Sequence, residues 1–147
     1  MVHSITCAGL LALLLCSLAA STSSAGDQAI QVIVHPDNAV SVVDREFVRS
    51  AFLKTAIRWP DSHHLLRPID LPRGLPGRAR FTRDILEKTP AQLRNFWVQR
   101  IFSGTAVPPP EADDPANAVA YVLAHPGGLG YVPLGTDIRD AKRVRIE

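Results

Sequence analysis

The most apolar stretch of the chain stands at its start. Residues 10–15 are almost all leucine, and residues 16–20 extend the run before small residues at positions 23 and 25. This apolar core is shorter than the roughly 20 residues that span a bilayer, and the small residues suit signal peptidase. The pattern predicts a signal peptide over residues 1–25, cleaved between Ala25 and Gly26, and a periplasmic or secreted mature chain. Because no Lys or Arg precedes the run, an uncleaved anchor stays open as the alternative.

The rest of the chain alternates between strand-like and helix-like patterns. Residues 28–35 carry a near-continuous β-branched run, which is typical of a buried strand. Thr89 and Gln92 have the spacing of a capping box around Pro90, which predicts a helix start. These signals predict, in order: a strand over 28–35, a helix from the N-cap Asp44, a short strand over 66–71, a helix over 76–88, a helix from Thr89 to a stop at Gly104, a stiff proline-rich loop over 107–114, a helix that opens at Asp114 and Pro115, and strands over 129–132 and 144–146.

Apolar residues at helical spacing give the predicted helices their buried faces. In the helix after Thr89, the stripe expected to be buried consists of Leu93, Phe96, Trp97 and Ile101. The order of elements predicts one layered α/β domain over 26–147, with a small, largely parallel sheet flanked by helices. The segment 144–146 is expected at the edge of this sheet.

Composition excludes several classes of function for this domain. The chain has 16 basic and 14 acidic residues, with no basic run and no aromatics interleaved with cations, so nucleic acid is not an expected partner. Cys7 and Cys16 both lie in the predicted signal peptide, which leaves the mature chain without disulfides, thiolate catalysis or cysteine metal sites. No second apolar span follows residue 25, so we expect no membrane span in the mature form.

Several segments, in order, resemble the phosphate-binding component of ABC phosphate importers. They are Phe52-Leu53-Lys54 with Trp59, then Arg67-Pro68-Ile69, Ile101-Phe102-Ser103-Gly104, and Pro126-Gly127-Gly128-Leu129-Gly130-Tyr131-Val132. The last segment is close to the family's Pro-Gly-Ala-Ile-Gly-Tyr-Val. The resemblance implies one lobe of a two-lobed, type II periplasmic-binding-protein fold and a non-catalytic, solute-binding role. It also implies a phosphate ligand, with a transporter permease, a sensor or self-association to complete the missing lobe.

The binding motif of that family is altered in this chain. The family holds phosphate with Ser-Gly-Thr at a helix N-terminus, preceded by an Arg and an Asp. Alignment on Gly74 places Leu75-Pro76-Gly77 at this motif, with Leu71 and Arg73 at the Arg and Asp positions. Pro76 removes a backbone donor and Leu75 lacks a hydroxyl, so phosphate capture by the family's mechanism is not expected to be retained.

Four arginines nevertheless surround the start of the helix expected over 76–88. They are Arg73, Arg78, Arg80 and Arg83. Cations there oppose the helix dipole, and a bound anion would reverse that effect. The alternative is that they point into solvent or pair with Asp70, Asp84 and Glu87. The candidate ligand-binding residues are therefore Arg73, Gly74, Leu75, Gly77, Arg78 and Ser103, for phosphate or another small anion.

Other chemistry is weakly indicated. No nucleophile elbow is present to begin a Ser-His-Asp triad, so we expect no enzyme. His63 and His64 are adjacent and fit a solvated loop better than a metal site, and no cofactor motif is recognised. Two hypotheses follow: an exported solute-binding domain for uptake or sensing, or an accessory module that has lost its ligand. The second predicts an exposed apolar or basic patch where another lobe would pack.

Overall fold

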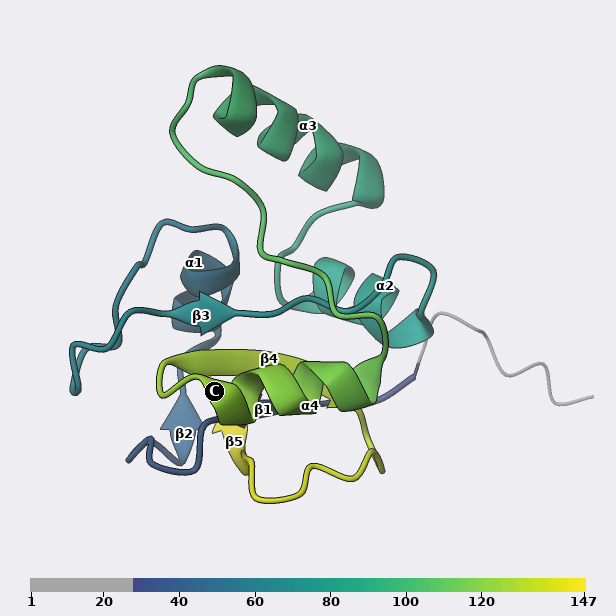
Figure 1. Cartoon of the computed structure of the whole chain (residues 1–147). Coiled ribbons are helices and arrows are strands. Elements are labelled where there is room, and N and C mark those ends of the chain that lie inside the picture. The colour runs from purple at the N-terminus through teal and green to yellow at the C-terminus, as the bar shows by residue number, and fades with distance from the viewer. Residues whose placement is uncertain (1–27) are drawn as a thin grey trace, which may run out of the picture.

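The computed structural model describes residues 28–147, so the predicted signal peptide and its cleavage site lie outside the described residues. Five strands and four helices follow one another in this part of the chain (Figure 1). Their bounds are β1 Ile30–Val34, β2 Val42–Val43, α1 Arg45–Phe52, β3 Arg67–Pro68, α2 Pro76–Asp84, α3 Pro90–Phe102, α4 Pro115–Ala124, β4 Gly128–Pro133 and β5 Lys142–Ile146. None of the helices formed by these residues is long and apolar enough to cross a membrane.

The strands form one mixed sheet in the order β2-β5-β1-β4-β3. The central strand β1 pairs antiparallel with both β4 and β5, while β2 is parallel to β5 and β3 is parallel to β4. Four strands therefore run in one direction and β1 runs in the other, which confirms the largely parallel α/β sheet. The predicted edge position of residues 144–146 is wrong. The two-residue strand β2, which has no clear sequence signal, pairs with the outer side of β5 through Val42 and Val43.

Helices cover both faces of the sheet. On one face, Gly130 of β4 lies against Val122 of α4, and Figure 1 shows α4 crossing in front of β4 and β1. On the other face, Gly77 of α2 lies against Ile30 of β1. These close approaches at glycine positions let the helices pack directly on the strands, and they produce the expected layered arrangement.

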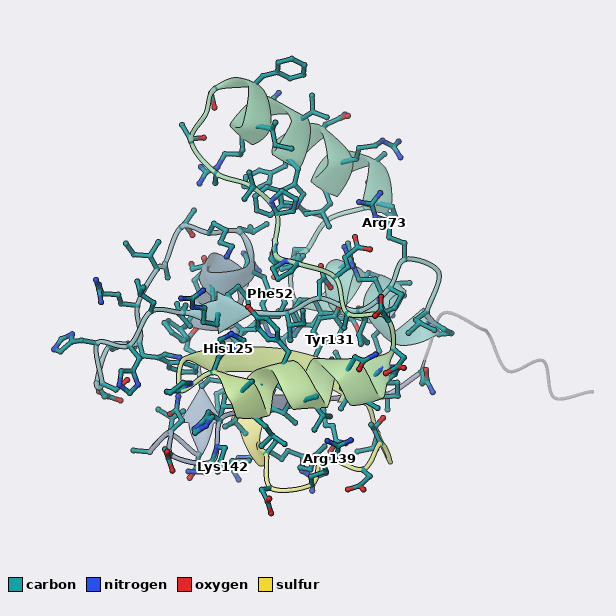
Figure 2. All side chains as sticks on the ribbon, viewed as in Figure 1. Phe52, Arg73, His125, Tyr131, Arg139 and Lys142 are labelled. Carbon is teal, nitrogen blue, oxygen red and sulfur yellow. The ribbon has the colours of Figure 1, made fainter. Side chains whose placement is uncertain are left out.

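An aromatic cluster fills the core between the sheet and the helices α1 and α2. The rings of Phe81 and Tyr131 stack at 3.8 Å, and Phe52 lies 4.6 Å from Phe81. Figure 2 shows Phe52 and Tyr131 in this interior, although they come from α1 and β4. This cluster joins three elements that are far apart in the sequence.

The helix starts follow the predicted caps. The side chains of Asp44, Thr89 and Asp114 each accept hydrogen bonds from first-turn amides, and Thr89 forms a complete capping box with Gln92. Helix α2, however, ends at Asp84 rather than at residue 88. The amides of the next residues turn back onto carbonyls of the same helix, and Glu87 adopts a left-handed φ of 51° that stops it.

The helix α3 projects from the body of the domain, held by the two segments that lead into and out of it (Figure 1). Leu93 and Trp97 are buried as expected, and Phe96 is half-buried. The predicted burial of Ile101 is wrong, since 50% of its surface is exposed. Helical spacing placed it on the correct face, but the body of the domain does not extend far enough to cover it.

Candidate functional site

A cleft of about 460 Å³ lies between α2, α3 and the loop that precedes α4. One face of α3 forms its apolar wall, through Leu93, Trp97, Val98 and Ile101. Leu93, Trp97 and Ile101 recur every four residues and Val98 lies three residues before Ile101, so all four project from the same side of the helix. A volume of this size falls within the usual range for small-molecule sites.

The opposite wall of the cleft comes from the start of α2. Arg73, Gly74 and Leu75 precede the helix, and Arg78 belongs to its first turn. Gly74 has a φ of 97°, a left-handed conformation that glycine adopts without strain, and it directs the chain into α2. The structure thus brings four of the six predicted site residues to one cleft.

A carboxylate of the chain itself meets the arginines of this cleft. Arg73 Nε donates to Glu111 Oε1 at 2.9 Å, and Arg78 Nη1 lies 3.7 Å from the same oxygen. Figure 2 shows Arg73 reaching from the loop before α2 toward α3. Because its side chain is 82% exposed, the Arg73–Glu111 pair is screened by water and weak. Glu111 therefore holds a position that an external anion would otherwise take.

Arg78 is held below the cleft by a buried carboxylate. Its Nη2 lies 2.8 Å from Asp70 Oδ2, and it also donates to the Leu71 carbonyl. Asp70 accepts two further hydrogen bonds, from the Leu71 amide at 3.0 Å and from the Tyr131 hydroxyl. Burial raises the pKa of Asp70 to about 6, against the opposing effects of the Arg78 charge and the Tyr131 hydrogen bond. Arg78 is thus already paired, and its first role is to tie α2 to the end of β3.

The first turn of α2 offers few free amides to an anion. Pro76 has no N–H, and the amides of Arg78 and Ala79 both donate to the Leu75 carbonyl at 3.0 and 3.2 Å. No side chain caps the helix, since Leu75 stands at the N-cap. Many helix N-termini bind phosphate through several free backbone N–H groups, and α2 has fewer of these groups.

The other two arginines near α2 pair with one carboxylate. Arg80 Nε lies 3.2 Å from Asp84 Oδ2, and Arg83 Nε lies 2.7 Å from Asp84 Oδ1. Of the acidic partners that the sequence suggested, Asp70 and Asp84 take that role, while Glu87 pairs with Arg49 of α1. The four arginines do not converge on a single point.

Two predicted site residues lie apart from the cleft. Gly77 is buried against the sheet, where a Cβ atom would stand 3.3 Å from Ile30 Cγ2. Ser103 is the C-cap of α3, and its hydroxyl bonds to the Arg100 carbonyl at 3.2 Å. Both residues shape the elements around the cleft rather than its walls.

The cleft also contains residues that the sequence analysis missed. Arg94 lines it and is exposed, and its side chain has no hydrogen bond or ion pair with any other residue of the described range 28–147. Its spacing from Trp97 and Ile101 along α3 could have revealed it, because all three lie on one helical face. Glu111 had no comparable local signal, since it reaches the site through a proline-rich loop.

A wider hollow of about 890 Å³ runs along β1 and β5 beside α1 and α2. Its arginines have partners: Arg80 pairs with Asp84, and Arg45 donates to the Asp84 carbonyl at 2.9 Å. Arg143 donates to Gln31 Oε1 at 3.5 Å, and Arg145 lies 3.9 Å from Glu147 Oε1. Within residues 28–147, no three His, Cys, Asp or Glu side chains gather as a metal site. The α2–α3 cleft is the better candidate, because it combines an apolar wall with Arg94, whose side chain has no hydrogen bond or ion pair within residues 28–147.

Comparison with known proteins identifies the fold. No family model and no curated protein matches the chain. Among solved structures, an ABC-type phosphate transport receptor from Vibrio cholerae matches with a TM-score of 0.65 at 11% identity, over 81% of this chain and 46% of that one. PstS from Borrelia burgdorferi matches with a TM-score of 0.63 at 11% identity, over 82% and 47%. A protein described as a phosphate ABC transporter substrate-binding protein, from Clostridium perfringens with bound phosphate, matches with a TM-score of 0.63 at 15% identity, over 81% and 45%.

These matches establish the fold as one lobe of a substrate-binding-protein architecture. The chain spans less than half the length of each of these structures. This agrees with the single lobe that the sequence resemblance implied.

Proposed function

We propose that this chain is a non-catalytic, solute-binding domain whose site is the α2–α3 cleft. The observation that carries the proposal is the cleft itself, in which an apolar wall on α3 faces Arg73 at the start of α2 and Arg94 extends from α3. Apolar walls with a few convergent polar groups are the usual composition of small-molecule sites. The fold supports this assignment, because its solved relatives are named as phosphate-transport receptors and substrate-binding proteins.

The ligand of this proposal is a small anion, with phosphate as one member of the class. Residues 1–25 act as a signal peptide, and residues 26–147 form the domain in the periplasm or outside the cell. A transporter permease, a sensor or a second copy of the chain covers the open side of the cleft, for uptake or sensing. An anion that enters must compete with Glu111 for Arg73, so bare phosphate binds weakly.

Thermal unfolding and calorimetry with phosphate, sulfate and pyrophosphate test this function. A ligand at 100 times its Kd that binds only the native state adds about 2.7 kcal/mol to the unfolding free energy. If the folded protein shows neither heat of binding nor stabilisation with any of the three at millimolar concentration, small inorganic anions are not its ligands.

A second candidate is the accessory module that has lost ligand binding. The exposed side chains of Phe102 at 88% and Val107 at 66% favour it, because they place apolar surface at the free end of α3. Light scattering and crosslinking test for self-association or a partner through this surface. A monomer that captures no partner would count against the module.

A further inference from the structure

The apolar face of α3 is covered over only half of its length. Leu93 and Trp97 are buried at 7% and 9% exposure, whereas Val98, the residue after Trp97, and Ile101, one turn beyond Trp97, are 45% and 50% exposed. All four line the same cleft. This part of the cleft therefore presents apolar side chains that the domain covers only by about half, and an apolar group placed there would be removed from water.

A cation stands on the same face of the helix. Arg94 lies one turn before Val98, and its guanidinium group has no hydrogen bond or ion pair within the described part of the chain. Across the cleft, the exposed Arg73 is matched only by Glu111, which Arg78 also approaches. Because Arg78 is already paired with Asp70, the cleft carries Arg73 and Arg94 against Glu111, and this excess of one positive charge is complementary to an anion.

We propose that the cleft binds an organic anion rather than a bare inorganic one. The oxyanion head, a carboxylate or a phosphate monoester, pairs with Arg94 and Arg73, and an apolar body lies against Trp97 and Ile101. This inference rests on the proposed function and narrows its ligand class. The apolar body adds binding free energy that inorganic phosphate lacks, and this addition offsets the competition from Glu111.

The experiment compares the binding of four probes to the full protein, which differ in whether they carry a negative charge, an apolar ring or both. Cyclohexyl phosphate and cyclohexanecarboxylate carry both features, inorganic phosphate carries only the charge, and cyclohexanol carries only the apolar body. Calorimetry gives the Kd values, and tryptophan fluorescence reports the site, since Trp97 lines the cleft while Trp59 is buried elsewhere in the core. We expect at least one cyclohexyl anion to bind at least tenfold more tightly than either inorganic phosphate or cyclohexanol.

Variants at exposed positions separate the two features without disturbing the core. Arg94→Gln removes the head contact and Ile101→Ser removes part of the apolar wall, and each should weaken the tighter cyclohexyl anion at least fivefold. The matched controls are Arg145→Gln on β5 and Phe102→Ser on α3, neither of which lines the cleft. Both controls should bind as the wild type does, and circular dichroism confirms that all four remain folded.

Different results would overturn the organic-anion inference and the proposed solute-binding function. If phosphate binds as tightly as both cyclohexyl anions, the apolar body is irrelevant, and the inference fails while the solute-binding function stands. If cyclohexanol binds as well as its phosphate ester, the charge is not recognised and the inference fails. If no probe binds the folded protein, both fail. A dimer that Ile101→Ser dissociates, with no probe bound, would show that a second copy fills the cleft.

Discussion

The substitution Glu111→Gln tests whether the chain's own carboxylate competes with its ligand. Glu111 Oε1 stands 2.9 Å from Arg73 Nε and 3.7 Å from Arg78 Nη1. The amide keeps the shape of the side chain and removes its charge, so both guanidinium groups gain capacity for an external anion. We expect anion binding to tighten, and folding to change little.

The geometry sets the size of both effects. The Arg73 and Glu111 side chains are 82% and 35% exposed, and an ion pair of this kind contributes about 0.2–1 kcal/mol, so stability should fall by less than about 1 kcal/mol. The repulsion is worked for an assumed separation of about 4 Å between the Glu111 carboxylate and an anion bound by the same arginine. Two like unit charges at that distance repel by about 1 kcal/mol in water and about 4 kcal/mol at an effective dielectric of 20. Removing even the smaller repulsion lowers the Kd about fivefold.

Calorimetric titration of both proteins with cyclohexyl phosphate and with inorganic phosphate measures this gain. Asp113→Asn is the matched control, because it removes one exposed acidic charge two residues away without touching the cleft lining. It should leave the Kd nearly unchanged. An unchanged or weaker affinity in Glu111→Gln, with the protein folded, would refute the idea that Glu111 occupies the anion position.

Three further predictions concern stability. The pKa of Asp70 is about 6 in the fold against 3.8 in its usual state, so the native state keeps a proton that the unfolded chain has lost. The unfolding free energy should then fall by about 2 kcal/mol between pH 4 and pH 7, and urea titrations should show this loss in the wild type but not in Asp70→Asn. Gly127→Ala would place a Cβ atom 1.8 Å from the Leu65 carbonyl oxygen, so urea unfolding should show a loss of at least about 2 kcal/mol; wild-type stability would contradict the backbone contact. Thr89→Ala removes the cap that bonds to Gln92 and should cost about 1 kcal/mol, visible as faster hydrogen exchange in α3, whereas unchanged exchange would show that the cap contributes nothing.

The local elements of the fold could be predicted because their signals lie within a few residues. Asp44, Thr89 and Asp114 mark helix starts through side chains that bond to amides two or three positions away. The end of α2 and the strand β2 could not be predicted in this way. The first depends on how Glu87 turns the chain, and the second consists of two residues that become a strand only because β5 lies beside them.

The candidate site could be predicted only in part, because its ion pairs join residues that are far apart in the sequence. The arginines near Gly74 are a local cluster, and the sequence predicts that they bind an anion, pair with nearby carboxylates or point into solvent. Which carboxylate meets which arginine depends on long-range contacts. Asp70 reaches Arg78 at the end of β3, and Glu111 reaches Arg73 from a loop 38 residues further along the chain.

The face of α3 shows what periodicity predicts and what it leaves open. Spacing establishes that Leu93, Trp97 and Ile101 share one side of a helix, and it is correct for all three. Whether that side is covered depends on the body beneath it, and here the body covers the first two and leaves Ile101 half exposed. An apolar stripe whose cover stops part of the way along, beside an arginine side chain with no partner in the described chain, is the arrangement from which we propose a site for an amphipathic ligand. The departure from the expected burial is therefore the strongest guide to function in this domain.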